Sequence, residues 1–277
     1  MLSFQQAKEG EGIPVKEKTY RADTGAEMET LQLAAQMIME HGGETYRAEE
    51  TVQHMGRGFG LHQVESFAVP SGLFISYRTP EGKLETSVRR VHRKATDLTL
   101  VNEVNRISRE TEAGKLDARQ ALVRLKAEQK RPRSGASLLL AAAICAGGFS
   151  FLFQGGPWDA LLAAGVALLV QGVALLLSRI PGPGIATQIL GGMLTAMLPV
   201  LAARYFPGLN AEAAVAGALM PLVPGLAMTN AVQDTLRGDM VSGLSHGASA
   251  LLTACLIAGG ALLSSALLRL AAGGGLG

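Results

Sequence analysis

The sequence predicts a membrane all-α bundle of five transmembrane helices, the fourth broken by prolines, preceded by a cytosolic α+β domain. One reason is charge: of 25 Lys+Arg and 23 Asp+Glu, all but eight lie in the first 133 residues. The other is a set of five apolar stretches, each close in length to the roughly 20 residues that a helix needs to cross a bilayer. We therefore expect a flexible segment at 1–25, a cytosolic domain at 26–133 and a transmembrane domain at 134–277.

Composition argues against several functional classes. The net charge of +2 averages two unlike halves, so it does not indicate a nucleic-acid partner. The N-terminus has no apolar core of signal-peptide length, which favours a cytosolic location for the charged half. Cys145 and Cys255 fall inside apolar stretches, where a thiol behaves as a small hydrophobic group. We therefore expect no disulfide, no metal site and no cofactor.

The cytosolic domain is predicted from amphipathic helices and one hairpin. Its first helix begins near Ala26, carries an apolar stripe through Leu31 and Ile38, and meets a stop signal at Gly42-Gly43. A hairpin is indicated by alternating apolar residues on both sides of a Pro-Glu-Gly turn. The second helix, the hairpin and two further helices are expected at 44–59, 64–91, 97–111 and 117–129, respectively.

The transmembrane helices follow in order. At 1.5 Å per residue, about 20 apolar residues match a hydrocarbon core of about 30 Å. Glycine, alanine and serine are frequent in these stretches, which is typical of helices that pack closely in a bundle or across a homo-oligomer interface within the lipid bilayer. The five spans are expected at 136–153, 159–178, 184–203, from about 211 onward, and at 242–268.

Basic residues set the expected orientation. Lys126, Lys130, Arg131 and Arg133 crowd the entry to the first span, and this places the N-terminal half in the cytosol. Counting spans from there puts the loop at 233–239 inside as well. Arg204 opposes the rule, but the larger cluster outweighs it.

The fourth span contains a helix-breaking sequence. Pro221, Pro224 and Gly225 occur in the run PLVPG. A proline removes one backbone hydrogen bond, and the carbonyl that it frees in a membrane must find a partner in protein, water or ligand. A simple kink is one interpretation. The other is a broken helix whose exposed backbone groups bind a solute, as in transporters.

Polar residues follow the break at helical spacing. Asn230, Gln233, Asp234 and Arg237 share one helix face, and a carboxylate near the membrane is a candidate functional group. Two interpretations stay open: Asp234 and Arg237 pair at the cytosolic rim, or Asp234 titrates while Thr229 and Asn230 bind a polar solute. Two further candidates for proton coupling are Asp239 and His246, although an intramembrane histidine also serves as hydrogen-bonded structure.

Two motifs together resemble the threonine/serine exporter family of bacterial membrane proteins. One is PLVPGLAMTNAVQDTLRGDMVSGLSHG at 221–247, and the other is HGGETYRAEETVQHMGRGFGL at 41–61, followed by VPSGLFISY. The similarity covers roughly residues 28 to 268. Fused members of the family carry a second, smaller membrane half, whereas this sequence ends after five spans. The resemblance therefore implies the larger subunit of a split system, with a separate small membrane protein as partner.

The resemblance also bears on substrate and on the N-terminal motif. Split systems are linked with succinate-like dicarboxylates and fused ones with threonine and serine, so the solute stays open. Glu44, Arg47 and Glu50 fall in the recurrent motif and are expected to gate the cytosolic mouth or contact the partner. A solvated helix face explains the same charged residues.

The resulting hypothesis is an inner-membrane secondary exporter subunit, proton-coupled, for small carboxylate-bearing metabolites. No phosphate-binding loop, nucleophile elbow or zinc motif is present in the sequence, so we do not expect an enzyme. The alternative is a non-transporting membrane scaffold or regulatory subunit with a cytosolic partner-binding domain. The expected substrate-binding residues are Pro221, Pro224, Gly225, Thr229, Asn230 and Gln233, and the expected proton-coupling residues are Asp234, Asp239 and His246.

Overall fold

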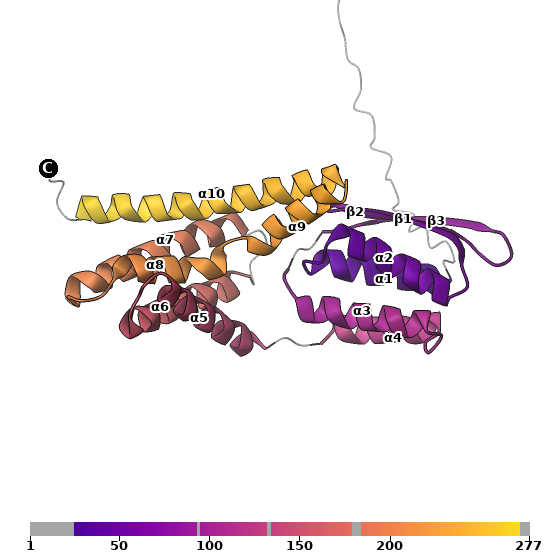
Figure 1. The fold of residues 1–277 in the computed structure, drawn as a ribbon, viewed down its shortest axis with the longest axis horizontal. Helices are drawn as coiled ribbons and strands as arrows, with labels where there is room; N and C mark the ends of the chain where they lie inside the picture. The colour runs from indigo at the N-terminus through magenta and orange to yellow at the C-terminus, as the bar shows by residue number, and fades with distance from the viewer. Residues whose placement is uncertain (1–24, 93–94, 132–133, 179–183, 272–277) are drawn as a thin grey trace, which may run out of the picture.

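The computed structural model describes residues 25–92, 95–131, 134–178 and 184–271, which form two units placed end to end (Figure 1). We call them the N-terminal unit, from α1 to α4, and the helix bundle, from α5 to α10. The distal end of the bundle is the end farthest from the N-terminal unit (Figure 1). The predicted flexible segment at 1–25 lies outside the described residues except for Gly25.

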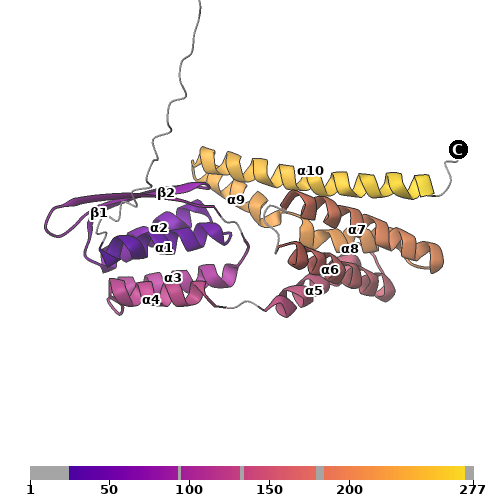
Figure 2. The same cartoon turned by 180° about the vertical axis from the view of Figure 1, so that it is seen from behind.

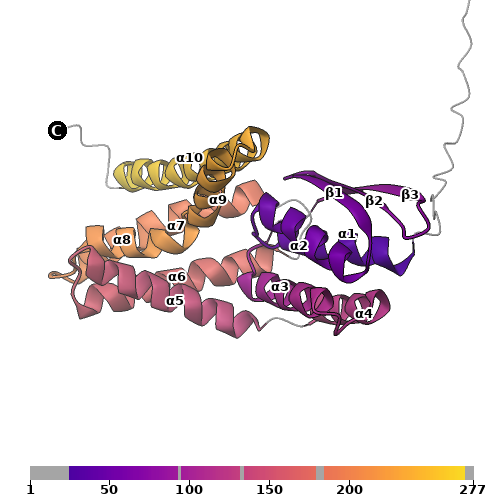
Figure 3. The same cartoon turned by 45° about the vertical axis from the view of Figure 1, so that its right-hand side comes forward.

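The N-terminal unit has three layers, best seen in Figure 3. An antiparallel sheet in the order β1-β2-β3 covers the α1–α2 pair, and α3 and α4 lie on the other side of that pair. The elements are α1 (Ala26–Glu40), α2 (Thr45–Gly58), β1 (His62–Val69), β2 (Gly72–Arg78), β3 (Leu84–Arg90), α3 (Leu98–Glu112) and α4 (Ala118–Gln129).

The core of this unit follows from the sequence periodicities. α1 is the central layer, so residues on nearly every side of it are buried, including Met28, Leu31 and Ile38. Alternation along β2 turns Leu73, Ile75 and Tyr77 inward. The predicted hairpin is confirmed as β2 and β3, joined through a turn in which the Gly82 N–H donates to the Thr79 carbonyl at 2.8 Å. β1 lies largely within the predicted range of 64–91, so the sheet has three strands where a two-stranded hairpin was predicted.

The helix bundle contains the predicted apolar helices. Four of its described helices are long and apolar enough to cross a membrane, and a fifth crossing is formed if a bent pair counts as one span. Only 17–28% of each such segment is buried within the protein, which leaves wide apolar surfaces for lipid or other helices. The elements are α5 (Gly135–Leu152), α6 (Pro157–Leu177), α7 (Gly184–Tyr205), α8 (Ala211–Leu219), η1 (Met220–Leu222), α9 (Gly225–Leu236) and α10 (Met240–Ala271).

The bent pair lies at the predicted break. Ala211–Leu222 and Gly225–Leu236 meet at 56°. Between them the chain makes short backbone bonds, from the Val223 N–H to the Met220 carbonyl at 3.2 Å and from the Gly225 N–H to the Val223 carbonyl at 2.8 Å. Pro221 lies in η1, and Pro224 directly precedes α9. As a result, α9 leaves the bundle and leans toward the N-terminal unit (Figure 1).

α7 and α10 run side by side in the bundle, and their backbones approach closely at two glycines (Figure 2). Gly192 lies against the Ile257 carbonyl and Gly260 against the Ile189 carbonyl, with no room for a Cβ at either glycine. Such pairs of small residues let helix backbones touch where apolarity gives no driving force. The crossing therefore fixes the two helices relative to each other.

We expect Gly192→Ala to lower the melting temperature of the detergent-purified protein. The added methyl group overlaps the Ile257 carbonyl, and overpacking of this kind costs about 1–3 kcal/mol. Gly165→Ala is the matched control, because a Cβ at Gly165 on α6 meets nothing within 4 Å. Equal melting temperatures for the two variants in a thermal denaturation series would contradict the close crossing.

Candidate functional site

The two sequence motifs meet where the N-terminal unit contacts the bundle. The turn between α1 and α2 lies against α9 and the start of α10, although Thr45 and Asp234 are 189 residues apart in sequence. Gly42 has a φ of 89° and approaches Leu226 so closely that a Cβ would be 2.9 Å from its Cδ2 atom. The Gly42 carbonyl also accepts a hydrogen bond from Asn230 Nδ2 at 3.2 Å. We call this contact region the junction.

The Asp234 carboxylate is the centre of the junction. It is 1% exposed, and each of its oxygens has a partner from a different element. Thr45 Oγ1 donates to Asp234 Oδ1 at 2.9 Å, and His246 Nδ1 lies 2.8 Å from Asp234 Oδ2. Thr45 is also the first residue of α2, where the positive end of the helix dipole favours a carboxylate. A protonated His246 would form an ion pair with Asp234.

Asp239 shares the Thr45 hydroxyl with Asp234. Its Oδ2 lies 3.2 Å from Thr45 Oγ1, while its Oδ1 accepts a hydrogen bond from the Ser242 N–H at 3.2 Å and so caps the start of α10. A threonine hydroxyl has one proton and can donate it to one carboxylate at a time. The two carboxylates therefore compete for a single donor.

Three further polar atoms, which lie on α9 and at the start of α10, are buried without a hydrogen-bond partner in the described part of the chain. They are Asn230 Oδ1, Gln233 Oε1 and Ser242 Oγ. Two of these are pure acceptors, and leaving a buried acceptor unpaired costs about 1–3 kcal/mol. A polar ligand or water that donates hydrogen bonds to them would relieve this cost.

The rim of the junction differs from the predicted ion pair between Asp234 and Arg237. The Arg237 guanidinium stacks on Tyr46, with Cζ 3.4 Å from the ring centroid, and no ion pair joins it to Asp234 among the described residues. Arg47 instead pairs with Glu44, from Nε to Oε2 at 2.6 Å. Glu50 points to solvent, with 61% of its side chain exposed. Of the three predicted gate residues, Glu44 and Arg47 thus lie beside the junction.

Not every predicted binding residue reaches the junction. Thr229 is exposed, and its hydroxyl donates to the Gly225 carbonyl at 3.0 Å within α9. Pro221, Pro224 and Gly225 lie at the break. Asn230 and Gln233 contribute the buried polar atoms described above. The predicted face is therefore divided between the break and the junction.

Two residues that sequence reasoning did not single out belong to this site. Thr45 lies inside the quoted N-terminal motif and supplies the donor to Asp234. Glu49 lies in the same motif, and its Oε1 accepts a hydrogen bond from the Ala68 N–H of β1 at 2.7 Å. Burial raises the pKa of Glu49, and the negative charges of Asp239 and Asp234 raise it further, against the Ala68 N–H, which lowers it. No single-residue pattern distinguishes Glu49 from its neighbour Glu50.

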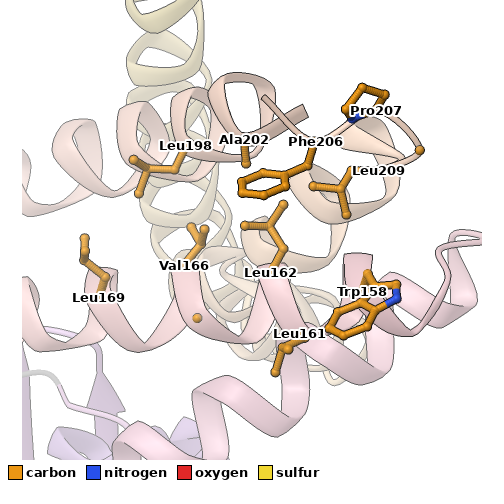
Figure 4. A pocket seen from close by; sticks show the side chains of 12 residues that line it. Trp158, Leu161, Leu162, Val166, Leu169, Leu198, Ala202, Phe206, Pro207 and Leu209 are labelled. Atoms are coloured by element: carbon orange, nitrogen blue, oxygen red, sulfur yellow. The ribbon is translucent and has the colours of Figure 1, made fainter. Parts of the chain in front are cut away.

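Other parts of the described structure offer less chemistry. An apolar cavity of about 940 Å³ lies at the distal end between α6 and α7, where Trp158, Leu162 and Phe206 line it (Figure 4). Such a lining suits lipid hydrocarbon or an apolar helix rather than a polar solute. Within the described ranges, no group of three or more His, Cys, Asp or Glu residues is placed to hold a metal ion.

Similarity to known proteins extends over most of the chain. A family model described as "Putative threonine/serine exporter" matches residues 29–268. Two proteins called "Probable succinate transporter subunit YjjP" are similar over 77% of this chain and 83% of their own length, at 26% identity in Escherichia coli and 28% in Klebsiella aerogenes. The "Probable threonine/serine exporter" of Mycobacterium tuberculosis is 25% identical over 83% of this chain and 44% of its own length. No solved structure matches the chain.

We expect Thr45→Val to destabilise the protein, because Asp234 loses its donor while staying buried. An unpaired buried group of this kind costs about 1–3 kcal/mol. Thr45→Ser keeps the hydroxyl and should retain most of the wild-type melting temperature. If valine and serine are tolerated equally in thermal denaturation, the hydrogen bond does not hold the junction.

Glu49→Gln should alter how stability depends on pH. A raised folded-state pKa means that the folded protein binds this proton more tightly than the unfolded chain. Wild-type stability therefore falls as pH rises from the unfolded pKa of about 4.3 through the higher folded value. Glutamine cannot ionise, so the variant should gain melting temperature relative to wild type between pH 4 and pH 7.

The matched control for this measurement is Glu50→Gln on the exposed side of the same helix. A difference between Glu49→Gln and wild type that stays constant over the pH range would show that Glu49 does not ionise in this window.

Proposed function

Because the chain belongs to the threonine/serine exporter family, we propose that it is the larger subunit of a proton-coupled exporter in the bacterial inner membrane. In this proposal residues 26–133 form a cytosolic domain and residues 134–277 form the transmembrane domain with five spans. The solute is a small carboxylate-bearing metabolite, either threonine and serine or a succinate-like dicarboxylate. No catalytic residue and no cofactor are assigned.

The observation that carries the proposal is the buried Asp234–His246 pair at the junction. A carboxylate held between an imidazole and a hydroxyl can gain and lose a proton within one hydrogen-bonded cluster. Loss of the negative charge on Asp234 weakens its attraction to Thr45 at the positive end of α2. We propose that this weakening frees α9 to move, so that proton binding is linked to opening of the cytosolic side.

Helix lengths support a position of the Asp234–His246 pair near the cytosolic surface of the membrane. α10 has 32 residues, which corresponds to about 48 Å, whereas the hydrocarbon core is about 30 Å thick. With Arg269 at the far boundary, the excess length extends toward the N-terminal unit and places His246 close to the inner boundary. α8 and η1 together have only 12 residues, about 18 Å, so the break falls inside the bilayer.

The break then supplies the substrate site. The prolines interrupt α-helical hydrogen bonding there, and in lipid such irregular backbone is tolerated where it lines a cavity. We assign substrate binding to the backbone at Pro221, Pro224 and Gly225, with Thr229, Asn230 and Gln233 at the cytosolic side of the break. Asp239 takes part in proton binding through its share of the Thr45 hydroxyl.

A partner is part of the proposal. Two relatives that this chain covers over 83% of their length are named transporter subunits, which supports a split system. The partner would be a separate small membrane protein of the same family. Glu44 and Arg47 beside the junction, and Glu50 on the exposed face, are placed to contact it or to gate the cytosolic mouth.

Counterflow in proteoliposomes tests the function. We expect the purified chain, together with its candidate partner, to exchange labelled for unlabelled threonine, serine or succinate. Asn230→Ala and Asp234→Asn should each reduce exchange at least about tenfold, since a lost hydrogen bond to a charged or buried group is worth about 1.5–3 kcal/mol.

Ser245→Ala is the control for these variants, because Ser245 is exposed next to His246 and no side-chain hydrogen bond joins it to the described residues of the junction. It should exchange solute at the wild-type rate. If no solute exchanges in a folded and partnered preparation, the chain is a scaffold or regulatory subunit instead.

A further inference from the structure

A second cluster of charge lies at the distal end of the bundle, away from the junction. A cavity of about 310 Å³ lies there between α7, α8 and α10 and is open to the surface. It begins beyond the glycine crossing and extends toward the ends of α7 and α10. Its lining comprises Ala196, Val200, Arg204, Val215, Ala261, Ser264, Ser265, Leu268 and Arg269.

The lining combines apolar walls with two guanidinium groups. Ala196, Val200 and Arg204 recur every four residues on α7, so they form one stripe that ends in an arginine. Arg269 stands at the matching end of α10. Apolar walls with a few convergent polar groups are the usual composition of a small-molecule site, and this volume is at the small end of the range.

Arg204 and Arg269 supply the hydrogen-bond donors available to a ligand in this cavity. Ser264 Oγ donates to the Ala261 carbonyl at 3.0 Å, and Ser265 Oγ donates to the Leu262 carbonyl at 2.8 Å. Neither Arg204 nor Arg269 has an ion-pair partner among the described residues. Asp159, one of the few acids at this end, already accepts hydrogen bonds from the Gly156 and Asn210 N–H groups. Both arginines are exposed, so they line the open mouth of one small cavity without an ion pair among the described residues.

We propose that this cavity is a binding site for a dicarboxylate, held by Arg204 and Arg269. A guanidinium presents a planar fork that matches a carboxylate, and two forks fit a ligand with two carboxylates. A zwitterionic amino acid would bring one carboxylate to the first arginine and an ammonium group toward the second, where like charges repel. The site therefore selects dicarboxylates over threonine and serine.

This inference rests on the proposed exporter for its biological meaning, as the site where solute leaves the transport path. α10 connects the two sites: His246 and Arg269 are 23 positions apart, which corresponds to about 35 Å of helix. The acceptor-rich junction and the donor-rich cavity thus lie toward opposite ends of one helix.

Thermal denaturation of the full chain in phosphatidylcholine nanodiscs tests the site. At constant ionic strength, succinate should raise the melting temperature in a saturable way, and threonine should not. Arg204→Gln and Arg269→Gln should each weaken the apparent succinate affinity about 10- to 100-fold, as expected for the loss of a charge-assisted hydrogen-bonded pair. Arg204→Lys, which keeps the charge and loses the fork, should lie between wild type and Arg204→Gln.

The control is Arg119→Gln, which removes an exposed arginine from α4 and should leave succinate binding unchanged. The proposal is overturned if the double glutamine variant binds succinate like wild type. It is also overturned if phosphatidylglycerol stabilises the protein through the same arginines while succinate has no effect, because the occupant is then a lipid phosphate.

Counterflow separates this proposal from the exporter proposal. Arginine-dependent succinate binding without exchange of any solute would leave the site standing and reject the exporter. Succinate exchange with an unchanged half-saturating concentration in the double glutamine variant would keep the exporter and reject the site.

Discussion

The structure depends on one buried carboxylate. Asp234 is 1% exposed, and burying a charge is costly unless it is paired and hydrogen-bonded. Its partners come from both units: Thr45 from the N-terminal unit and His246 from α10. Removing the N-terminal unit would leave Asp234 Oδ1 without its Thr45 donor. The carboxylate therefore gives a physical reason for the two units to be held together, beyond the connection between α4 and α5.

The geometry around Asp234 follows from this requirement. α9 must leave the bundle to bring Asp234 to the α2 N-terminus, and the 56° bend at the break provides that departure. The chain must then reverse so that His246 can face back toward α9. Gly238, with a φ of 89°, makes this turn, and Gly243 lies so close to Thr235 that a side chain would not fit. The break, the turn at Gly238 and the long α10 together bring Asp234 into contact with Thr45 and His246.

Much of the fold could be predicted from the sequence, because local patterns carry it. The apolar stretches and the Pro-Glu-Gly turn each act over a few residues, and the helices predicted at 97–111 and 117–129 lie close to the observed α3 and α4. Polar residues after the break were also recognised as a candidate site. The role of Thr45 could not be predicted, since its partner is 189 residues away. Glu49 and Glu50 look alike in sequence, and only the position of β1 separates them. The arginine-lined cavity likewise requires the packing of α7 on α10, which composition does not specify.

A double-mutant cycle between Thr45 and Asp234 tests the central claim most directly. The free energy of unfolding would be measured for wild type, for Thr45→Val, for Asp234→Asn and for the double variant. Residues in direct contact show coupling of about 0.5–3 kcal/mol, and the account predicts more than about 1 kcal/mol here, because the second substitution has no charged hydrogen bond left to break. Effects that add to within about 0.5 kcal/mol would mean that the two motifs are adjacent without depending on each other, and the account would be wrong.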